Sequence, residues 1–178
     1  RISVMNSIIN TKDIVILRHP LNRLISAYYS YGWSHGTNSH TKPMMKRRNK
    51  IRTQNLDQYI IANQLDAIDL YSKIMEHHKN KIFKYEDIMD QPQKYIRFLL
   101  QKINEEKIFD ELWISLRYEF EFNGKDLSED IIAGKSKSHR RNLDHLEYKR
   151  KISSEILSNL SSRLKNVICD YENIPNLL

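Results

Sequence analysis

Apolar and polar positions alternate along this chain in a way that predicts two short strands among several helices. Four consecutive apolar residues indicate a buried strand over Asp13 to Arg18, and a similar run indicates a second over Lys81 to Tyr85. Helical spacing of apolar residues predicts helices at Pro20 to about Trp33, 56–78, Pro92 to about Ile103, and one last helix with apolar positions from Ile156 to Ile168, capped by Ser153 or Ser154. The pattern favours an α/β fold that is rich in helix.

Three stretches lack a clear period. Residues 34–54 are polar and basic, with one apolar pair at Met44-Met45, and predict a long loop. Residues 109–122 are apolar and aromatic and fit either a helix or a loop. Residues 123–145 are polar and predict a second long connection.

Length and charge narrow the class of protein. A chain of 178 residues predicts a single domain over 1–178, and a hydrophobic fraction of 40% is enough for a core. The net charge of +7 favours anionic partners such as nucleotides, nucleic acids or acidic glycans. An ordinary soluble basic surface explains the same charge equally well.

Cysteine usage and the absence of apolar runs bear on the compartment. Cys169 is the only cysteine, so no internal disulfide forms, which fits a reducing environment. No apolar run approaches the roughly 20 residues that span a bilayer, and no signal-peptide pattern is present. A cytoplasmic location without a membrane segment is therefore expected. The start at Arg1 rather than methionine suggests an N-terminal truncation.

The first candidate for chemistry is Arg18, which comes where the first strand would end. Pro20 suits the first turn of the helix that follows, and Ser26 lies on that helix. A strand end beside a helix start is where α/β sheets bind phosphorylated ligands, and arginine offers a planar fork of donors to phosphate. In the alternative, Arg18 pairs with a carboxylate and Ser26 is an ordinary helix residue.

The order strand-Arg-His-Pro-x2-Arg-Leu-x-Ser-Ala-Tyr resembles the second cofactor motif of the sulfotransferases, which use 3′-phosphoadenosine 5′-phosphosulfate (PAPS). The His-Pro form and the Ser-Ala-Tyr ending resemble the carbohydrate sulfotransferases in particular. The resemblance implies that Arg18 and Ser26 hold the 3′-phosphate of the nucleotide.

Two further stretches extend the resemblance. Phe83 to Ile88, followed by Pro92, is similar to the family segment whose tyrosine contacts adenine, a role that falls on Tyr85. The alternative is a tyrosine packed at a sheet edge. The late cluster from Gly134 to Asn142 is loosely similar to the basic loop over the 3′-phosphate and implies that Lys135 and Arg141 bind phosphate. It lacks the family's Arg-Lys-Gly order and its tryptophan, and a solvated basic loop is the alternative.

The resemblance implies a P-loop-NTPase-like three-layer sandwich with a parallel sheet. The family's lysine-bearing phosphosulfate loop belongs before Arg18, yet residues 1–17 contain no such loop. We therefore expect that the first strand and this loop are missing from the chain. The catalytic base normally lies in the same region, so the catalytic residues stay unassigned. The histidines show no metal-ligand spacing, and no metal is expected.

The function implied is that of a PAPS-dependent sulfotransferase that moves a sulfuryl group to a hydroxyl acceptor, releasing adenosine 3′,5′-bisphosphate. The acceptor is expected to be a carbohydrate, and the basic stretch 42–52 is expected to hold an acidic glycan. Three alternatives stay open: a basic nucleic-acid-binding module, a P-loop nucleotide kinase, and an inactive protein with the sulfotransferase fold. The first is disfavoured because no known nucleic-acid-binding motif is present.

Overall fold

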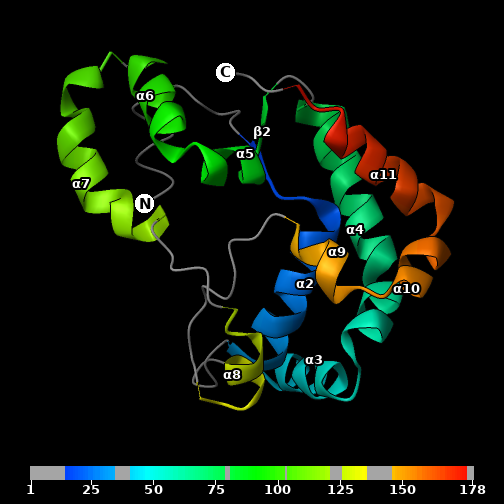
Figure 1. The fold of residues 1–178 in the computed structure, drawn as a ribbon. Helices are drawn as coiled ribbons and strands as arrows, with labels where there is room; N and C mark the ends of the chain where they lie inside the picture. The colour runs from blue at the N-terminus through cyan, green and yellow to red at the C-terminus, as the bar shows by residue number, and fades with distance from the viewer. Residues whose placement is uncertain are drawn as a thin grey trace. The chain divides into compact units, whose positions relative to one another are not determined.

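A computed structural model describes residues 15–34, 41–78, 81–102, 104–120, 126–135 and 146–175 (Figure 1). The chain divides into two compact units. Unit 1 consists of Arg1–Arg18, Ile74–Asn123 and Asn173–Leu178. Unit 2 consists of His19–Lys73 and Gly124–Glu172. The single-domain expectation stays a prediction, and each unit is described by itself.

Unit 1 contains a parallel pair of strands. β1 (Val15–Leu17) pairs with β2 (Ile82–Lys84) in the register Val15↔Ile82, Ile16↔Phe83 and Leu17↔Lys84. Both predicted strands are confirmed, and within the described residues they form a two-stranded sheet. A parallel pair requires a crossover connection, so the predicted α/β class is correct.

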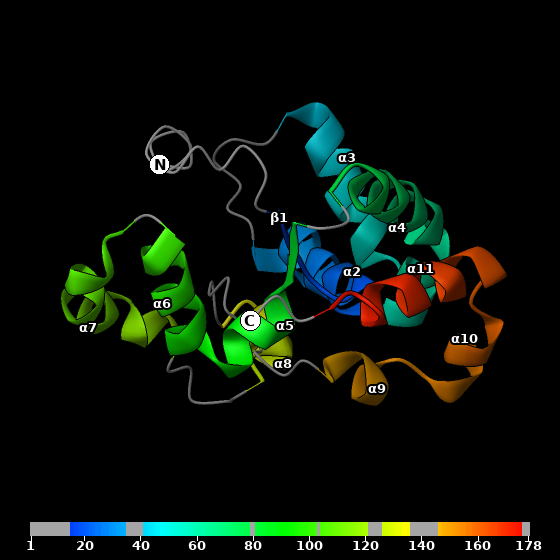
Figure 2. The ribbon, with the colours of Figure 1, turned by 90° about the horizontal axis from the view of Figure 1, so that it is seen from above.

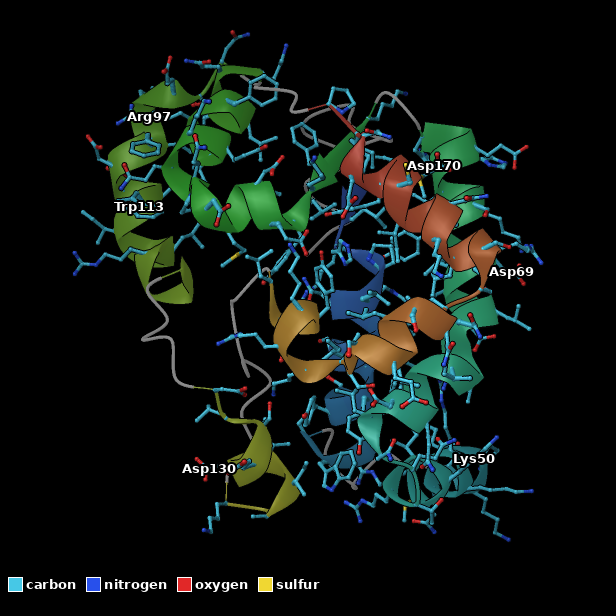
Figure 3. All side chains as sticks on the ribbon, turned by 45° about the vertical axis from the view of Figure 1, so that its right-hand side comes forward. Lys50, Asp69, Arg97, Trp113, Asp130 and Asp170 are labelled. Atoms are coloured by element: carbon cyan, nitrogen blue, oxygen red, sulfur yellow. The ribbon has the colours of Figure 1, made fainter. Side chains whose placement is uncertain are left out.

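The helices of unit 1 follow β2. α5 (Tyr85–Asp90), α6 (Pro92–Lys102), the 3-10 turn η2 (Glu106–Ile108) and α7 (Phe109–Phe120) come in that order. α6 lies where a helix was predicted from Pro92, and α7 shows that the ambiguous stretch is helical. Leu100 of α6 and Phe109 of α7 are buried in one apolar cluster, and the Arg97 guanidinium lies 3.6 Å from the centre of the Phe109 ring. Figure 3 shows Arg97 and Trp113 on this pair of helices.

Unit 2 begins with the helix that follows Arg18. α2 (Pro20–Tyr29) continues into a π-helical turn, η1 (Ser30–Ser34), so the predicted helix to about Trp33 has the right extent but widens in its last turn. α4 (Leu56–His78) has the predicted bounds, and its part up to Lys73 belongs to unit 2. Several side chains of these two helices are fully or almost fully buried, among them Leu21, Ile25, Tyr59, Ile60, Ala67 and Tyr71.

The predicted loop over 34–54 is wrong in its second half, which forms α3 (Lys42–Arg52). The helix was missed because it has no apolar stripe. Only Arg48 and Ile51 of its residues are buried, so an arginine occupies an inward position that normally carries an apolar side chain.

Arginine side chains form hydrogen bonds that hold α3 against the π-helical turn. Arg48 Nε donates to the Tyr31 carbonyl at 3.3 Å, and Arg52 Nε donates to the Gly32 carbonyl at 2.8 Å. The absence of a side chain at Gly32 matters for this packing, because a Cβ there would lie 3.2 Å from Ile51. Polar bonds to widened backbone therefore replace part of the usual apolar contact.

In the C-terminal part of unit 2, the described residues form α8 (Ser128–Ile132), α9 (Glu147–Lys151), α10 (Ser154–Asn159) and α11 (Ser162–Glu172). The single last helix of the sequence prediction is thus wrong, since the chain is extended at Leu160 and begins a new helix. Ser153 caps α10, as predicted, by accepting from the Ile156 N–H at 3.2 Å, and Ser161 accepts from the Leu164 N–H in the same way. Figure 2 shows α10 and α11 as separate segments.

α11 packs along α4. Figures 1 and 2 both show the two helices side by side, and the rings of Tyr71 and Tyr171 meet edge to face with centroids 6.5 Å apart. Across the described ranges, no helix combines the length and apolar character needed to cross a membrane.

Candidate functional site

The carboxyl ends of the two parallel strands bring Arg18 and Tyr85 together. Because Leu17 pairs with Lys84, the next residue of each strand emerges at the same edge of the sheet. The Arg18 guanidinium carbon lies 5.1 Å from the centre of the Tyr85 ring. Both residues are half-buried and both belong to unit 1.

This contact is a cation–π pair, in which the positive guanidinium is attracted to the electron-rich face of the phenol. The N–H donors of a guanidinium lie in the plane of the group and point outward, and two of them together bind a phosphate in a bidentate manner. The ring of Tyr85 has a second face that the Arg18 contact does not use. The pair thus combines an anion-binding group with an aromatic surface at the edge where parallel sheets bind ligands.

His19–Lys73 belong to unit 2, and there the His-Pro step of the motif has a structural role. The His19 ring stacks on Tyr148 with centroids 4.3 Å apart, meets Tyr171 edge-on, and has Nε2 3.8 Å from a carboxylate oxygen of Glu172. Its exposed fraction is 5%. Next to it, Asn22 accepts from the Tyr148 N–H at 3.1 Å, which ties α2 to α9.

The other sequence-predicted residues belong to unit 2 or lie outside the described residues. Ser26 is half-buried on α2 in unit 2. Lys135 is exposed after α8, and its N–H donates to the Asp130 carbonyl at 2.8 Å. Arg141 lies outside the described residues. The roles of Ser26, Lys135 and Arg141 as phosphate ligands stay predictions, as do those of Arg18 and Tyr85.

A pocket of about 440 Å³ lies within unit 2, bordered by α2, α4, α8 and α9. Its apolar lining comes from Tyr29, Leu56 and Ile132. Its polar lining comes from Asp126, Ser128, Glu129 and Lys151. Figure 3 shows α8, with Asp130 labelled, at the side of unit 2 that carries this pocket.

The ammonium of Lys151 is the centre of the polar wall. Its Nζ lies 2.7 Å from Asp126 Oδ2 and 3.4 Å from Glu147 Oε1, and it donates to Ser128 Oγ. It also lies 4.9 Å from the centre of the Tyr29 ring. Ser128 in turn donates through both its hydroxyl and its backbone N–H to Asp126 Oδ1.

This network fixes the charge of Asp126. Burial raises the pKa of its carboxyl, but the hydrogen bonds from Lys151 and Ser128 and the positive charge of Lys151 outweigh burial and lower the pKa to about 2. Asp126 is therefore a permanent acceptor at neutral pH, although its side chain is 39% exposed.

Sequence reasoning did not single out this cluster. The local signals were Asp126-x-Ser128, a spacing that favours a side-chain bond to the backbone two residues on, and the i,i+4 pair Glu147 and Lys151. Neither signal shows that these two segments meet. Within the part of the chain that the structure describes, no three histidine, cysteine or acidic residues are grouped so as to hold a metal ion.

Comparison of the chain with protein-family models, with curated proteins and with solved structures gave no match. The resemblance to the sulfotransferases therefore stands on the motif residues, and its consequences are proposals.

Proposed function

We propose that the chain is a PAPS-dependent sulfotransferase with a carbohydrate acceptor. The observation that carries the proposal is the Arg18–Tyr85 pair at the carboxyl edge of the parallel strands. The sequence motifs assign these residues to the two ends of one nucleotide, the 3′-phosphate and the adenine. A nucleotide that binds both Arg18 and Tyr85 requires that they lie close together, as they do in unit 1.

The chemistry of the pair suits an adenosine 3′-phosphate. The purine stacks on the ring of Tyr85, a contact that aromatic side chains make with any base. The phosphate accepts from the N–H groups of Arg18. Ser26, Lys135 and Arg141 are assigned to phosphate by resemblance alone.

The proposed fold is a P-loop-NTPase-like sandwich with a parallel sheet. The parallel order of β1 and β2, with helices between them in the chain, supports this choice over an antiparallel architecture. The first strand and the phosphosulfate loop of that fold have no counterpart among the sequence motifs.

The proposed reaction is an in-line transfer. The acceptor hydroxyl oxygen forms a bond to sulfur while the bond between sulfur and the bridging phosphate oxygen breaks, and the hydroxyl proton passes to a base that is not assigned here. The leaving group is adenosine 3′,5′-bisphosphate. Positioning and charge stabilisation account for most catalysis of this type, and Arg18 contributes by holding the nucleotide.

The proposed acceptor is an acidic glycan, and the support comes from α3. Lys42, Lys46 and Lys50 are exposed and follow each other at i,i+4 spacing, so they form one stripe along the helix. No acidic residue occurs between positions 42 and 52. Figure 3 shows Lys50 on this helix. A regular row of cations matches the repeating negative charges of a glycan polymer.

Calorimetry with adenosine 3′,5′-bisphosphate and with adenosine 5′-monophosphate tests the donor site on the full chain. We expect the bisphosphate to bind more tightly. Arg18→Ala is expected to weaken it about ten- to hundred-fold, as the loss of charge-assisted hydrogen bonds does. Tyr85→Ala is expected to weaken both nucleotides, whereas Tyr85→Phe keeps the ring and most of the affinity.

Arg163→Ala is the matched control, because Arg163 is a surface arginine with a side chain 68% exposed. It is expected to leave nucleotide affinity unchanged. Absence of bisphosphate binding, or binding that Arg18→Ala does not alter, contradicts the proposal. Tighter binding of ATP than of the bisphosphate would favour the kinase alternative.

Binding of hyaluronan at moderate salt tests the acceptor class. We expect the combined change of Lys42, Lys46 and Lys50 to glutamine to weaken hyaluronan binding about ten-fold, because each exposed charge contributes a fraction of a kcal/mol. Neutral dextran serves as the uncharged control and is not expected to bind α3. Much tighter binding of single-stranded DNA at the same salt concentration would point to the nucleic-acid alternative instead.

A further inference from the structure

The pocket of unit 2 has the size and lining of a small-molecule site. Its volume of about 440 Å³ falls within the roughly 300–1,000 Å³ that is usual for such sites. Tyr29, Leu56 and Ile132 supply apolar surface, and the side chains of Asp126, Ser128 and Lys151 form a connected polar wall. A pocket of this kind selects its ligand through the hydrogen bonds that its wall leaves open.

The wall disfavours anions. The three hydrogens of the Lys151 ammonium face Asp126, Ser128 and Glu147, so they are already engaged by protein acceptors. Asp126 and Glu129 border the pocket as carboxylates, and Lys151 is the only cation that borders it among the described residues. A phosphate or sulfate would meet more negative than positive charge there.

The wall accepts hydrogen bonds rather than donating them. Lys151 compensates the charge of Asp126 at 2.7 Å, and with Glu129 the lining keeps more negative than positive charge. The carboxylate oxygens of Asp126 and Glu129 can only accept hydrogen bonds. The complementary ligand carries no negative charge, donates several hydrogen bonds and has an apolar face for the leucine, isoleucine and tyrosine side chains.

We propose that this pocket binds a hydroxyl-rich ligand without negative charge, of the size of one or two sugar rings. Its hydroxyl groups donate to Asp126 and Glu129, and its C–H face packs on Leu56 and Ile132. The site consists of unit 2 residues alone and does not depend on the proposed nucleotide site.

The probes are glucose, glucuronate and glucosamine, which share a ring and differ in charge, and the readout is the amide NMR spectrum of the full chain. Glucose is expected to shift the signals of Ser128 to Ile132 and of Tyr29, with a dissociation constant on the order of millimolar. Glucuronate is expected to bind at least about ten-fold more weakly, because it brings a negative charge to a lining that is itself negative. Glucosamine brings a positive charge and is expected to bind at least as tightly as glucose.

Two variants and a control localise the binding without disturbing the Lys151 network. Ile132→Trp fills the pocket from a position that is 46% exposed, and it is expected to abolish the glucose shifts. Glu129→Gln, at an exposed acceptor, is expected to weaken glucose several-fold. Leu65→Trp adds the same ring at a position 59% exposed and outside the pocket, and it is expected to have no effect.

The proposal is overturned if glucose produces no shifts at these residues, or if glucuronate binds as tightly as glucose. It is also overturned if Ile132→Trp keeps a native spectrum and still binds glucose. Nucleotide binding is measured separately on the same variants. Failure of the nucleotide site alone therefore leaves the pocket proposal intact, and failure of the pocket alone leaves the nucleotide proposal intact.

Discussion

Replacing Lys151 by methionine removes one charge from a network in which two carboxylates depend on it. Glu147 is fully buried and lies 3.4 Å from the ammonium, and Asp126 lies 2.7 Å from it. Methionine keeps the unbranched stem that packs near Tyr29, so the substitution changes charge far more than volume.

The expected cost is about 3 kcal/mol of the free energy of unfolding. The Asp126 pKa falls from 3.8 to about 2, which corresponds to roughly 2 kcal/mol and is halved to about 1 kcal/mol because a third or more of that side chain is exposed. The loss of the ammonium beside the buried Glu147 adds about 2 kcal/mol, since removing one partner of a buried pair is costly. The midpoint of thermal unfolding should fall by roughly 6–12 °C.

The pH dependence gives a second, independent signature. Because the folded pKa of Asp126 lies below its unfolded pKa, the stabilisation is present above about pH 4 and is lost as the pH falls towards 2. Without Lys151, Asp126 loses the main cause of its low pKa. The difference in stability between the wild type and Lys151→Met should therefore shrink by about 1 kcal/mol over that interval.

Urea unfolding followed by circular dichroism, at neutral pH and in steps down to about pH 2, measures both effects. Lys50→Met, at an exposed lysine of α3, is the control and should change stability by less than about 0.5 kcal/mol. The double variant Lys151→Met with Glu147→Gln should recover part of the loss. A cost below about 1 kcal/mol at pH 7, or an unchanged difference at acid pH, would refute the reasoning.

Two further predictions concern a tyrosine in unit 1 and a helix cap in unit 2. Burial, followed by the charge of Asp87 and its hydrogen bond with the phenol, raises the pKa of Tyr95 to about 12, so stability should fall as the pH rises from 10 to 12. Spectrophotometric titration should show a late-titrating fraction that decreases by one tyrosine in Tyr95→Phe, and a titration that Tyr95→Phe leaves unchanged would contradict this. Ser153→Ala removes the acceptor for the Ile156 N–H and should cost about 1 kcal/mol in urea unfolding, while Ser153→Asp should cost little; equal losses would show that the cap is unimportant.

The elements that the sequence predicted well are those whose apolar side chains fill a core. α2 and α4 bury residues at helical spacing, and β1 and β2 lie in short apolar runs, so both patterns are visible without a structure. Pro20 and Pro92 marked the starts of α2 and α6 because proline fits the first turn of a helix.

α3 was not predictable in this way, because Ile51 is its only buried apolar side chain and its hydrogen bonds to the π-helical turn are made by Arg48 and Arg52. The break between α10 and α11 was hidden for the opposite reason. The apolar stripe continues across the extended residue Leu160, although the pair Ser161-Ser162 offered a capping signal for a new helix.

The candidate sites differ in what the sequence reveals about them. Arg18 and Tyr85 each follow a predicted strand, and parallel pairing alone is enough to bring them together. The contact of Lys151 with Asp126 joins two segments that no local pattern links. Such a network becomes visible only when the tertiary structure is known.

The interleaved order of the two units has a consequence for synthesis of the chain. β1 leaves the ribosome before α2, α3 and α4, and its partner β2 follows only after them. At a translation rate of roughly 5–20 residues per second, β1 stays without its hydrogen-bonding partner for several seconds, and an unpaired strand is a template for aggregation. α2, α3 and most of α4, which belong to unit 2, emerge during that interval. Unit 1 is therefore the part of the nascent protein that must be protected from aggregation with other chains.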